Sequence, residues 1–119
     1  MKTTDKFRYQ TYGGFYTCQF ATGRYGNGNL ALEAMGAEGT QEEGDPIVRV
    51  TVNPGVPVPE DCIAVKNYSE NEGMDNLLIS LGIIEDTPVA RIPSGFVEIP
   101  VYRLTESGKE LFKDNRQEV

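Results

Sequence analysis

Apolar and polar side chains alternate over several short stretches of this chain, and this pattern limits its fold more than any other feature. A period of two is typical of β-strands that bury one face and expose the other. Along 15–22, Cys18 and Phe20 would share the buried face. In the later stretch 46–52, Thr51 is predicted to face solvent. The predicted strands cover residues 7–12, 15–22, 30–36, 46–52, 62–66 and 95–104.

Turn-forming residues separate these strands. Gly13-Gly14 is a two-residue hairpin signal between the first two strands, and the loop 23–29, rich in glycine and asparagine, predicts a second hairpin. Proline donates no hydrogen bond to a strand ladder. Pro93 and Pro100 therefore predict that the last strand lies at an edge or contains a bulge.

One segment changes from the period of a strand to the period of a helix. Ser69 and Glu72 have the S-x-x-E spacing of a capping box, and Gly82 stands where a helix commonly ends. The sequence therefore predicts an amphipathic helix over about 69–82. Its apolar stripe consists of Met74, Leu77, Leu78 and Leu81.

These elements predict a single domain over 1–119 of the α+β class. Its antiparallel sheet would have five to six strands, built from hairpins and a meander, with the helix at 69–82 packed on one face. A short closing helix at 105–112 would be capped by Thr105, and the tail 113–119 would be frayed. The strands come early instead of alternating with helices, which favours α+β over α/β.

Charge is unevenly distributed along the chain, whose formal net charge is −7. Residues 31–86 contain twelve acidic and only two basic residues. The sequence has no cluster of Lys and Arg to neutralise phosphates, which argues against direct nucleic-acid binding. An acidic middle suits a protein partner with a basic surface, and simple solubility is the alternative explanation.

Residues with catalytic chemistry are scarce. The chain has no histidine, so the commonest general base near neutral pH is missing. Glu70 and Glu72 are two residues apart, and on a helix they would not converge on one substrate. The sequence therefore argues against an enzyme and offers no catalytic residue.

The sequence also indicates no metal, cofactor or membrane segment. Cys18 and Cys62 lie in predicted strands without CxxC spacing, as buried structural thiols of a reducing compartment do. Read as a calcium loop, the segment from Asn67 lacks the glycine at position 6 and the carboxylate at position 12. No apolar run resembles a signal peptide or is long enough to span a bilayer, so we expect a cytoplasmic protein.

Polar side chains in several segments are candidates for a binding surface. Capping would explain Ser69, Glu70 and Glu72, but it leaves four neighbours unexplained: Asn67, Tyr68, Asn71 and Gly73. The remaining candidates lie in the loop 23–29, in the acidic connection 37–45 and before the last strand. They are Tyr25, Asn27, Asn29, Glu42, Glu43, Asp45 and Arg91.

Four segments in the same order resemble a bacterial domain family of unknown function. They are "YGNGNLAL", "PIVRVTVN", "KNYSENEGM" and "SGFVEIPVYRL", and the resemblance covers most of residues 15–104. "KNYSENEGM" departs from the aspartate-threonine-asparagine sequence of the commoner members. The family occurs widely in gut anaerobes, often in mobile elements. The resemblance implies a small α+β fold and a mobile-element origin, and it supplies no catalytic residues.

Three functions are consistent with these observations. The leading hypothesis is a small non-catalytic protein-interaction module whose acidic, polar surface is built from the loop 37–45, the proline-rich loop 53–61 and the segment 67–71. The second is a small-ligand-binding protein or hydrolase with a pocket near Tyr68, Asn71 and Arg91. The third is a structural subunit of a homo-oligomer, which would show a large apolar self-interface.

Overall fold

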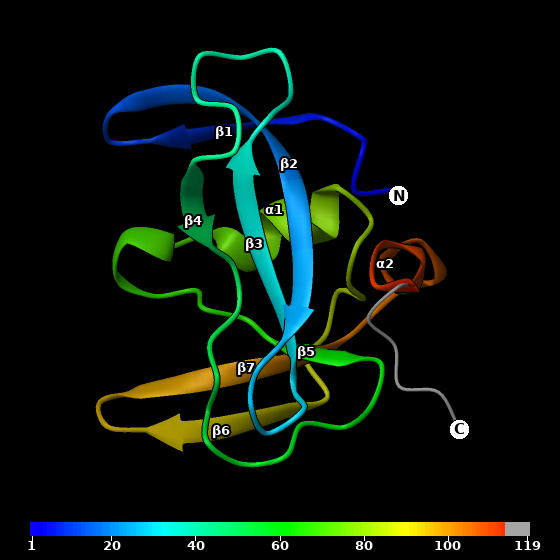
Figure 1. The fold of residues 1–119 in the computed structure, drawn as a ribbon. Coiled ribbons are helices and arrows are strands. Elements are labelled where there is room, and N and C mark those ends of the chain that lie inside the picture. Colours follow the sequence, from blue (N-terminus) through cyan, green and yellow to red (C-terminus); the bar gives the residue numbers. More distant parts are fainter. Residues whose placement is uncertain (114–119) are drawn as a thin grey trace.

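The computed structural model describes residues 1–113 and consists mostly of β-strands (Figure 1). Four strands form one antiparallel sheet in the order β1-β2-β3-β4, and three form another in the order β5-β7-β6. The strands are β1 (Phe7–Thr11), β2 (Gly14–Arg24), β3 (Leu30–Gly36), β4 (Pro46–Arg49), β5 (Cys62–Ala64), β6 (Ala90–Ser94) and β7 (Val97–Arg103). The helical elements are the 3₁₀ turn η1 (Ser69–Asn71) and the helices α1 (Met74–Ser80) and α2 (Glu106–Leu111).

The predicted α+β fold, with one sheet of five to six strands and a main helix, is therefore wrong. The described residues form two sheets and two short helices. The sequence did not predict β6. Pro93 interrupts the apolar–polar alternation of this strand, and its pairing partner is β7, the strand that follows it. No helix within residues 1–113 is long and apolar enough to cross a membrane.

β2 is long enough to pair with different strands along its length. Its first residues pair with β1 and its later residues pair with β3, and Cys18 has a partner on each side. The turn between β1 and β2 is Tyr12-Gly13, one residue earlier than predicted. The β1–β2 hairpin extends away from the body of the molecule (Figure 1).

The three-stranded sheet contains a proline in its central strand, against the prediction of an edge or a bulge. Pro100 lies in β7, where its carbonyl oxygen accepts a hydrogen bond from Val65 N at 3.0 Å. Pro100 cannot donate in return, and β5 ends at Ala64, beside this missing bond. Pro93 lies in β6, an edge strand that the sequence did not predict. An antiparallel bridge between Thr51 and Val65 links this sheet to the other one.

The predicted helix over 69–82 is shorter than its sequence pattern suggests. Ser69 begins a 3₁₀ turn with φ of 55°, and Gly73 has φ of 87°, which no right-handed helix contains. α1 therefore begins at Met74, and no side chain caps either η1 or α1, so the predicted capping box is wrong. The predicted helix end is confirmed, because Gly82 has φ of 74° and donates to the carbonyl of Ile79.

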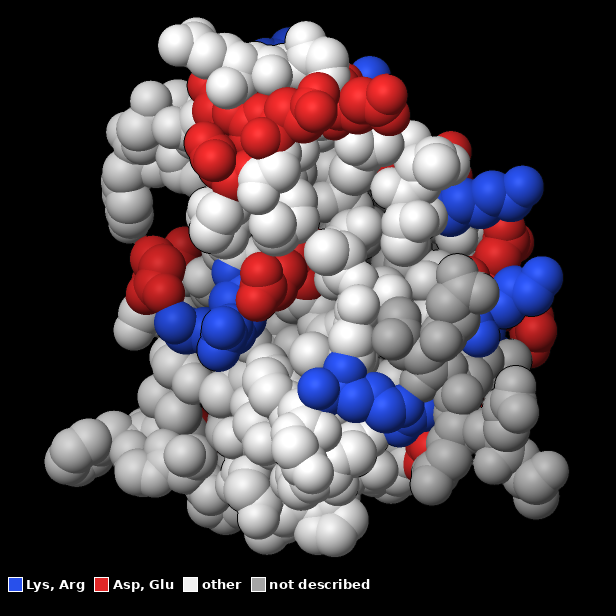
Figure 2. Space-filling view, in the orientation of Figure 1, with Lys and Arg blue, Asp and Glu red and all other residues white. Residues whose placement is uncertain are grey.

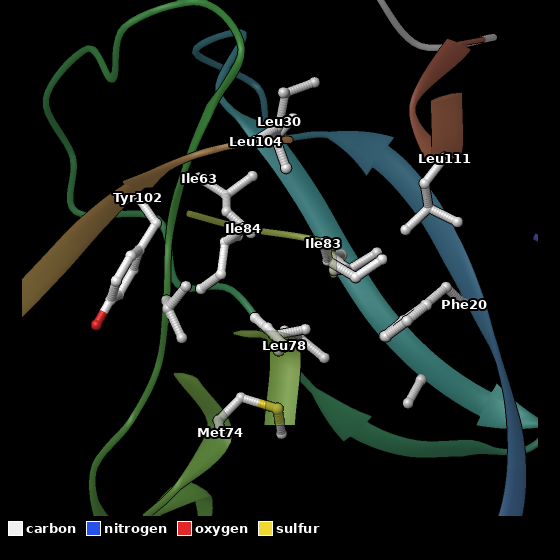
Figure 3. Packing of buried hydrophobic residues seen from close by; sticks show 14 of the residues in the cluster. Phe20, Leu30, Ile63, Met74, Leu78, Ile83, Ile84, Tyr102, Leu104 and Leu111 are labelled. Carbon is white, nitrogen blue, oxygen red and sulfur yellow. The ribbon is translucent and has the colours of Figure 1, made fainter. Parts of the chain in front are cut away.

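One hydrophobic core is shared by the two sheets and both helices. Figure 3 shows Met74 and Leu78 of α1 directed toward core residues that include Ile63 of β5 and Phe20 of β2. The predicted cap of α2 is confirmed, since Thr105 Oγ1 accepts a hydrogen bond from Gly108 N. A smaller cluster on the other face of the three-stranded sheet consists of Cys62, Ala64, Ile99 and Val101, with Val52, Val58, Tyr68 and Ile92 packed against it.

Thr51 was predicted to face solvent, but the residue is buried. Its hydroxyl lies 3.0 Å from the Tyr25 hydroxyl and accepts a hydrogen bond from Leu32 N at 2.9 Å. Because the hydroxyl has partners on both sides, burial leaves no polar group unsatisfied. The strand alternation alone carried no sign of these partners.

Candidate functional site

The candidate site is a cavity of about 470 Å³ that lies between β1, β4 and the chain from η1 to α1. Its volume is within the range of small-molecule and peptide-binding pockets. Figure 2 shows the projecting hairpin at the left of the molecule with a hollow between it and the body. The lining residues are Tyr9, Gln10, Thr11, Tyr12, Ile47, Val48, Ser69, Glu70, Glu72, Gly73 and Met74.

The free edge of β1 borders this cavity. Thr11 pairs with Gly14 across a two-residue turn, so the backbone groups of Thr11 and Tyr9 point toward β2. The N–H and C=O groups of Arg8 and Gln10 point the other way, toward the free edge. Within residues 1–113 these groups have no hydrogen-bond partner, so the edge is open to another strand.

The other three sheet edges differ from that of β1. At β5, the carbonyl of Ala64 accepts a hydrogen bond from Val52 N at 3.1 Å. At β4, the carbonyl of Arg49 accepts a hydrogen bond from the side-chain nitrogen of Asn71 at 2.6 Å. At β6, the outward-facing position Pro93 has no N–H to donate. Among the four edges of the described sheets, only the β1 edge presents consecutive outward positions that can both donate and accept.

The floor of the cavity is apolar and its rim is acidic. Ile47, Val48 and Met74 contribute apolar side chains, while Glu70 and Glu72 are exposed at the rim. Glu70 forms an ion pair with Lys66, and this hydrogen bond holds the pKa of the Glu70 carboxyl below its usual value. Glu72 has no side-chain partner within residues 1–113, so its carboxylate is available to a cation.

Tyr9 connects the edge strand to this rim. Its half-buried ring packs against the core. Burial is the main cause that raises the pKa of its phenol, and the nearby Cys18 and Glu70 raise it further. The phenol is therefore neutral near pH 7 and can donate a hydrogen bond into the cavity.

Of the four unexplained residues before α1, only Gly73 lines the cavity. Asn71 is 1% exposed and holds η1 against the β4 edge, so its role is structural. Asn67 donates to Asp75 Oδ2 at 3.4 Å, an atom that also accepts from the hydroxyl of Tyr102. Tyr68 packs against the smaller hydrophobic cluster. The structure thus separates residues that the sequence placed together.

The candidates in the loop 23–29 belong to an internal hydrogen-bond network. Asn29 is 7% exposed, and its side chain bonds Asn53 Oδ1, Val56 O and Val58 N. The side-chain nitrogen of Asn27 donates to the same oxygen of Asn53. The hydroxyl of Tyr25 lies 3.0 Å from that of Thr51. These side chains tie the loop to the proline-rich segment.

The acidic loop 37–45 lies at the top of the molecule, where Figure 2 shows acidic side chains gathered. Glu43 accepts a hydrogen bond from Gly39 N at 2.6 Å, and the carbonyl of Asp45 accepts from Gly36 N. Glu42 is half-buried. Because the proline-rich loop lies at the opposite end of the molecule (Figure 1), these two loops do not form one surface.

Arg91 is exposed on β6 and is not a neighbour of the cavity. Burial and the hydrogen bond to Asp75 raise the pKa of Tyr102, and the positive charge of Arg91 lowers it by a smaller amount. The structure therefore does not gather Tyr68, Asn71 and Arg91 around the cavity. Within residues 1–113, no group of three or more Cys, Asp and Glu side chains is placed to hold a metal ion.

Sequence reasoning missed the β1 side of the site. The alternating pattern predicts only a strand for Tyr9, Gln10 and Thr11, since alternation does not say which edge of a strand remains unpaired. Tyr12 is 99% exposed at the hairpin turn, and an aromatic residue at a turn was the one available signal. Comparison of the chain with protein-family models, curated proteins and solved structures gives no match. The resemblance to a bacterial family of mobile elements therefore stays a prediction.

Proposed function

We propose that this protein is a small non-catalytic interaction module that binds a protein partner in the cavity beside β1. We call this site the β1 groove, defined by the cavity-lining residues given above. The observation that carries the proposal is the open edge of β1 directly beside an acidic-rimmed cavity. Strand edges are usually covered, charged or blocked by proline, so an open edge beside a cavity is an unusual combination.

The groups that line the β1 groove favour binding over catalysis. The chain lacks histidine, and the hydrogen bond to Lys66 lowers the pKa of the Glu70 carboxyl at the rim, which makes it a weaker base. Both cysteine thiols are buried, and burial raises their pKa, which makes them poor nucleophiles. The available chemistry consists of hydrogen bonding, apolar contact and attraction of cations.

A selection of random ten-residue peptides displayed on phage tests this proposal. Peptides that bind the wild-type protein are measured again on Glu72→Arg and on the matched variant Glu98→Arg, an exposed carboxylate on β7. We expect Glu72→Arg to abolish most of the binding and Glu98→Arg to leave it unchanged. A selection without enriched peptides, or peptides that bind both variants equally, contradicts the proposal.

A further inference from the structure

We infer that the β1 groove binds an extended, basic segment of the partner, which adds to the four-stranded sheet as a fifth strand beside β1. This inference rests on the proposed function and specifies its ligand. Strand addition of this kind obtains affinity from backbone hydrogen bonds and specificity from pockets that receive alternate side chains. Both features are present at the β1 groove.

The backbone positions set the geometry of the added strand. Arg8 and Gln10 are separated by one residue and both direct their N–H and C=O groups outward, as the paired residues of an antiparallel or parallel ladder do. A partner strand would therefore form up to four hydrogen bonds with these two residues. Gln10 lies in the wall of the cavity, so this strand would run along the cavity and not across open solvent.

The face of β1 decides which partner side chains enter the cavity. Phe7 is buried and Tyr9 and Thr11 line or approach the cavity, so this face of the strand points inward. Side chains of a neighbouring strand alternate in the same way. Every second residue of the partner would consequently enter the cavity, while the residues between would point to solvent beside Arg8 and Gln10.

The shape of the cavity favours lysine or arginine at the inward positions. Their methylene chains can lie along Ile47, Val48 and Met74, while the charged ends reach the carboxylates at the rim. Glu72 has no ion-pair partner within residues 1–113. A cation near Tyr9 or Tyr12 would also be attracted by the face of an aromatic ring. The protein's net charge of −7 attracts a basic segment at longer range.

A second copy of the chain is a poorer ligand for this groove. In an antiparallel pairing of two β1 strands, the inward positions of the second copy would be Phe7, Tyr9 and Thr11, none of which is basic. The basic Arg8 of each copy would stay on the outer face. The acidic rim would then remain without a positive partner.

Defined peptides test the inference without knowledge of the natural partner. The probe is fluorescein-labelled Thr-Lys-Val-Lys-Thr-Lys-Val, in which lysine occupies every second position. Its control is Lys-Lys-Lys-Thr-Thr-Val-Val, with the same composition and charge but no alternation. Fluorescence anisotropy at low salt should show the alternating probe binding at least about tenfold more tightly. Hydrogen exchange should show the Arg8 and Gln10 amides protected by this probe and the Arg91 amide unchanged.

Two pairs of variants separate the backbone contribution from the charge contribution. Gln10→Pro removes an outward N–H as Pro93 does at β6, and Arg91→Pro is its matched change at the β6 edge. We expect Gln10→Pro to weaken the binding of the alternating probe about tenfold, which corresponds to the loss of one hydrogen bond. We expect Arg91→Pro to leave this binding unchanged. Glu72→Gln should weaken the binding of this probe about threefold or more, and the control Glu98→Gln should leave it unchanged. Circular dichroism confirms that each variant is folded.

The outcomes distinguish this inference from the proposed function. If the selected phage peptides depend on Glu72 but are neither basic nor affected by Gln10→Pro, the inference is wrong and the proposed function stands. Equal binding of both lysine peptides also overturns the inference. So does self-association through β1, measured by sedimentation, in a protein that binds neither peptide.

Discussion

Replacing Asn71 with alanine tests whether this residue is structural or free to bind a ligand. Its side-chain nitrogen donates to the carbonyl of Arg49 at 2.6 Å, and the residue is 1% exposed. This contact joins η1 to the edge of β4, two of the elements around the β1 groove. Asn71→Ala removes the donor and leaves the partly buried carbonyl of Arg49 without this partner.

The expected loss of stability follows from these contacts. Removing the partner of a partly buried carbonyl costs about 1–2 kcal/mol. The shortened side chain also leaves a small cavity, which adds to this cost. We therefore expect Asn71→Ala to lower the free energy of unfolding by about 2–3 kcal/mol. For a domain of this length that corresponds to a decrease in Tm of about 8–12 °C.

Urea unfolding followed by circular dichroism measures this difference. Asn27→Ala is the matched control, because Asn27 is exposed and Asn53 Oδ1 keeps a hydrogen bond from Asn29. The other hydrogen bond it removes, from Asn29 N to Asn27 Oδ1, is a long one at 3.3 Å. The control should change stability by less than about 0.5 kcal/mol. If Asn71→Ala lowers the free energy of unfolding as little as the control does, Asn71 does not hold η1 to β4 and the structural assignment is refuted.

The variant Asn71→Asp adds a test in the pH dependence. The aspartate cannot donate to the Arg49 carbonyl when ionised, and burial raises its folded pKa above the unfolded value of about 3.9. The folded state then binds more protons than the unfolded state. The stability deficit should therefore shrink as the pH falls through the raised pKa. A deficit that grows on acidification contradicts this reasoning.

Three other measurements test separate features of the structure. Gly36→Ala places a methyl group 1.8 Å from a backbone carbonyl of the acidic loop and should cost more than about 2 kcal/mol in urea unfolding, whereas Gly23→Ala has open space and should be nearly neutral. NMR titration of the Glu70 carboxyl should give a pKa below 4.5, and this pKa should move back toward 4.5 in Lys66→Met. Because the folded pKa is lowered, any stability that this ion pair contributes is present above pH 4.5 and is lost on acidification. The two cysteine thiols, buried and with raised pKa, should resist iodoacetamide at pH 8 until urea unfolds the protein; alkylation at equal rates in both states would refute their burial.

The sequence by itself determined the buried face of the strand over 15–22. Because successive side chains point to opposite sides of a strand, the alternation in 15–22 placed Cys18 and Phe20 in the core, and both are buried. Local chemistry also located the end of α1 at Gly82 and the cap of α2 at Thr105. These features depend on residues that are close together in the chain.

Tertiary structure decided which strands pair, where α1 begins and which edge stays open. Ser69 and Glu72 have the spacing of a capping box, but Asn71 bonds to β4, and the chain turns through Gly73 before α1 can start. Thr51 is buried because its hydroxyl meets groups from other strands. The open edge of β1 likewise depends on what the rest of the chain leaves uncovered. Such contacts join residues far apart in the sequence, so a local pattern contains no record of them.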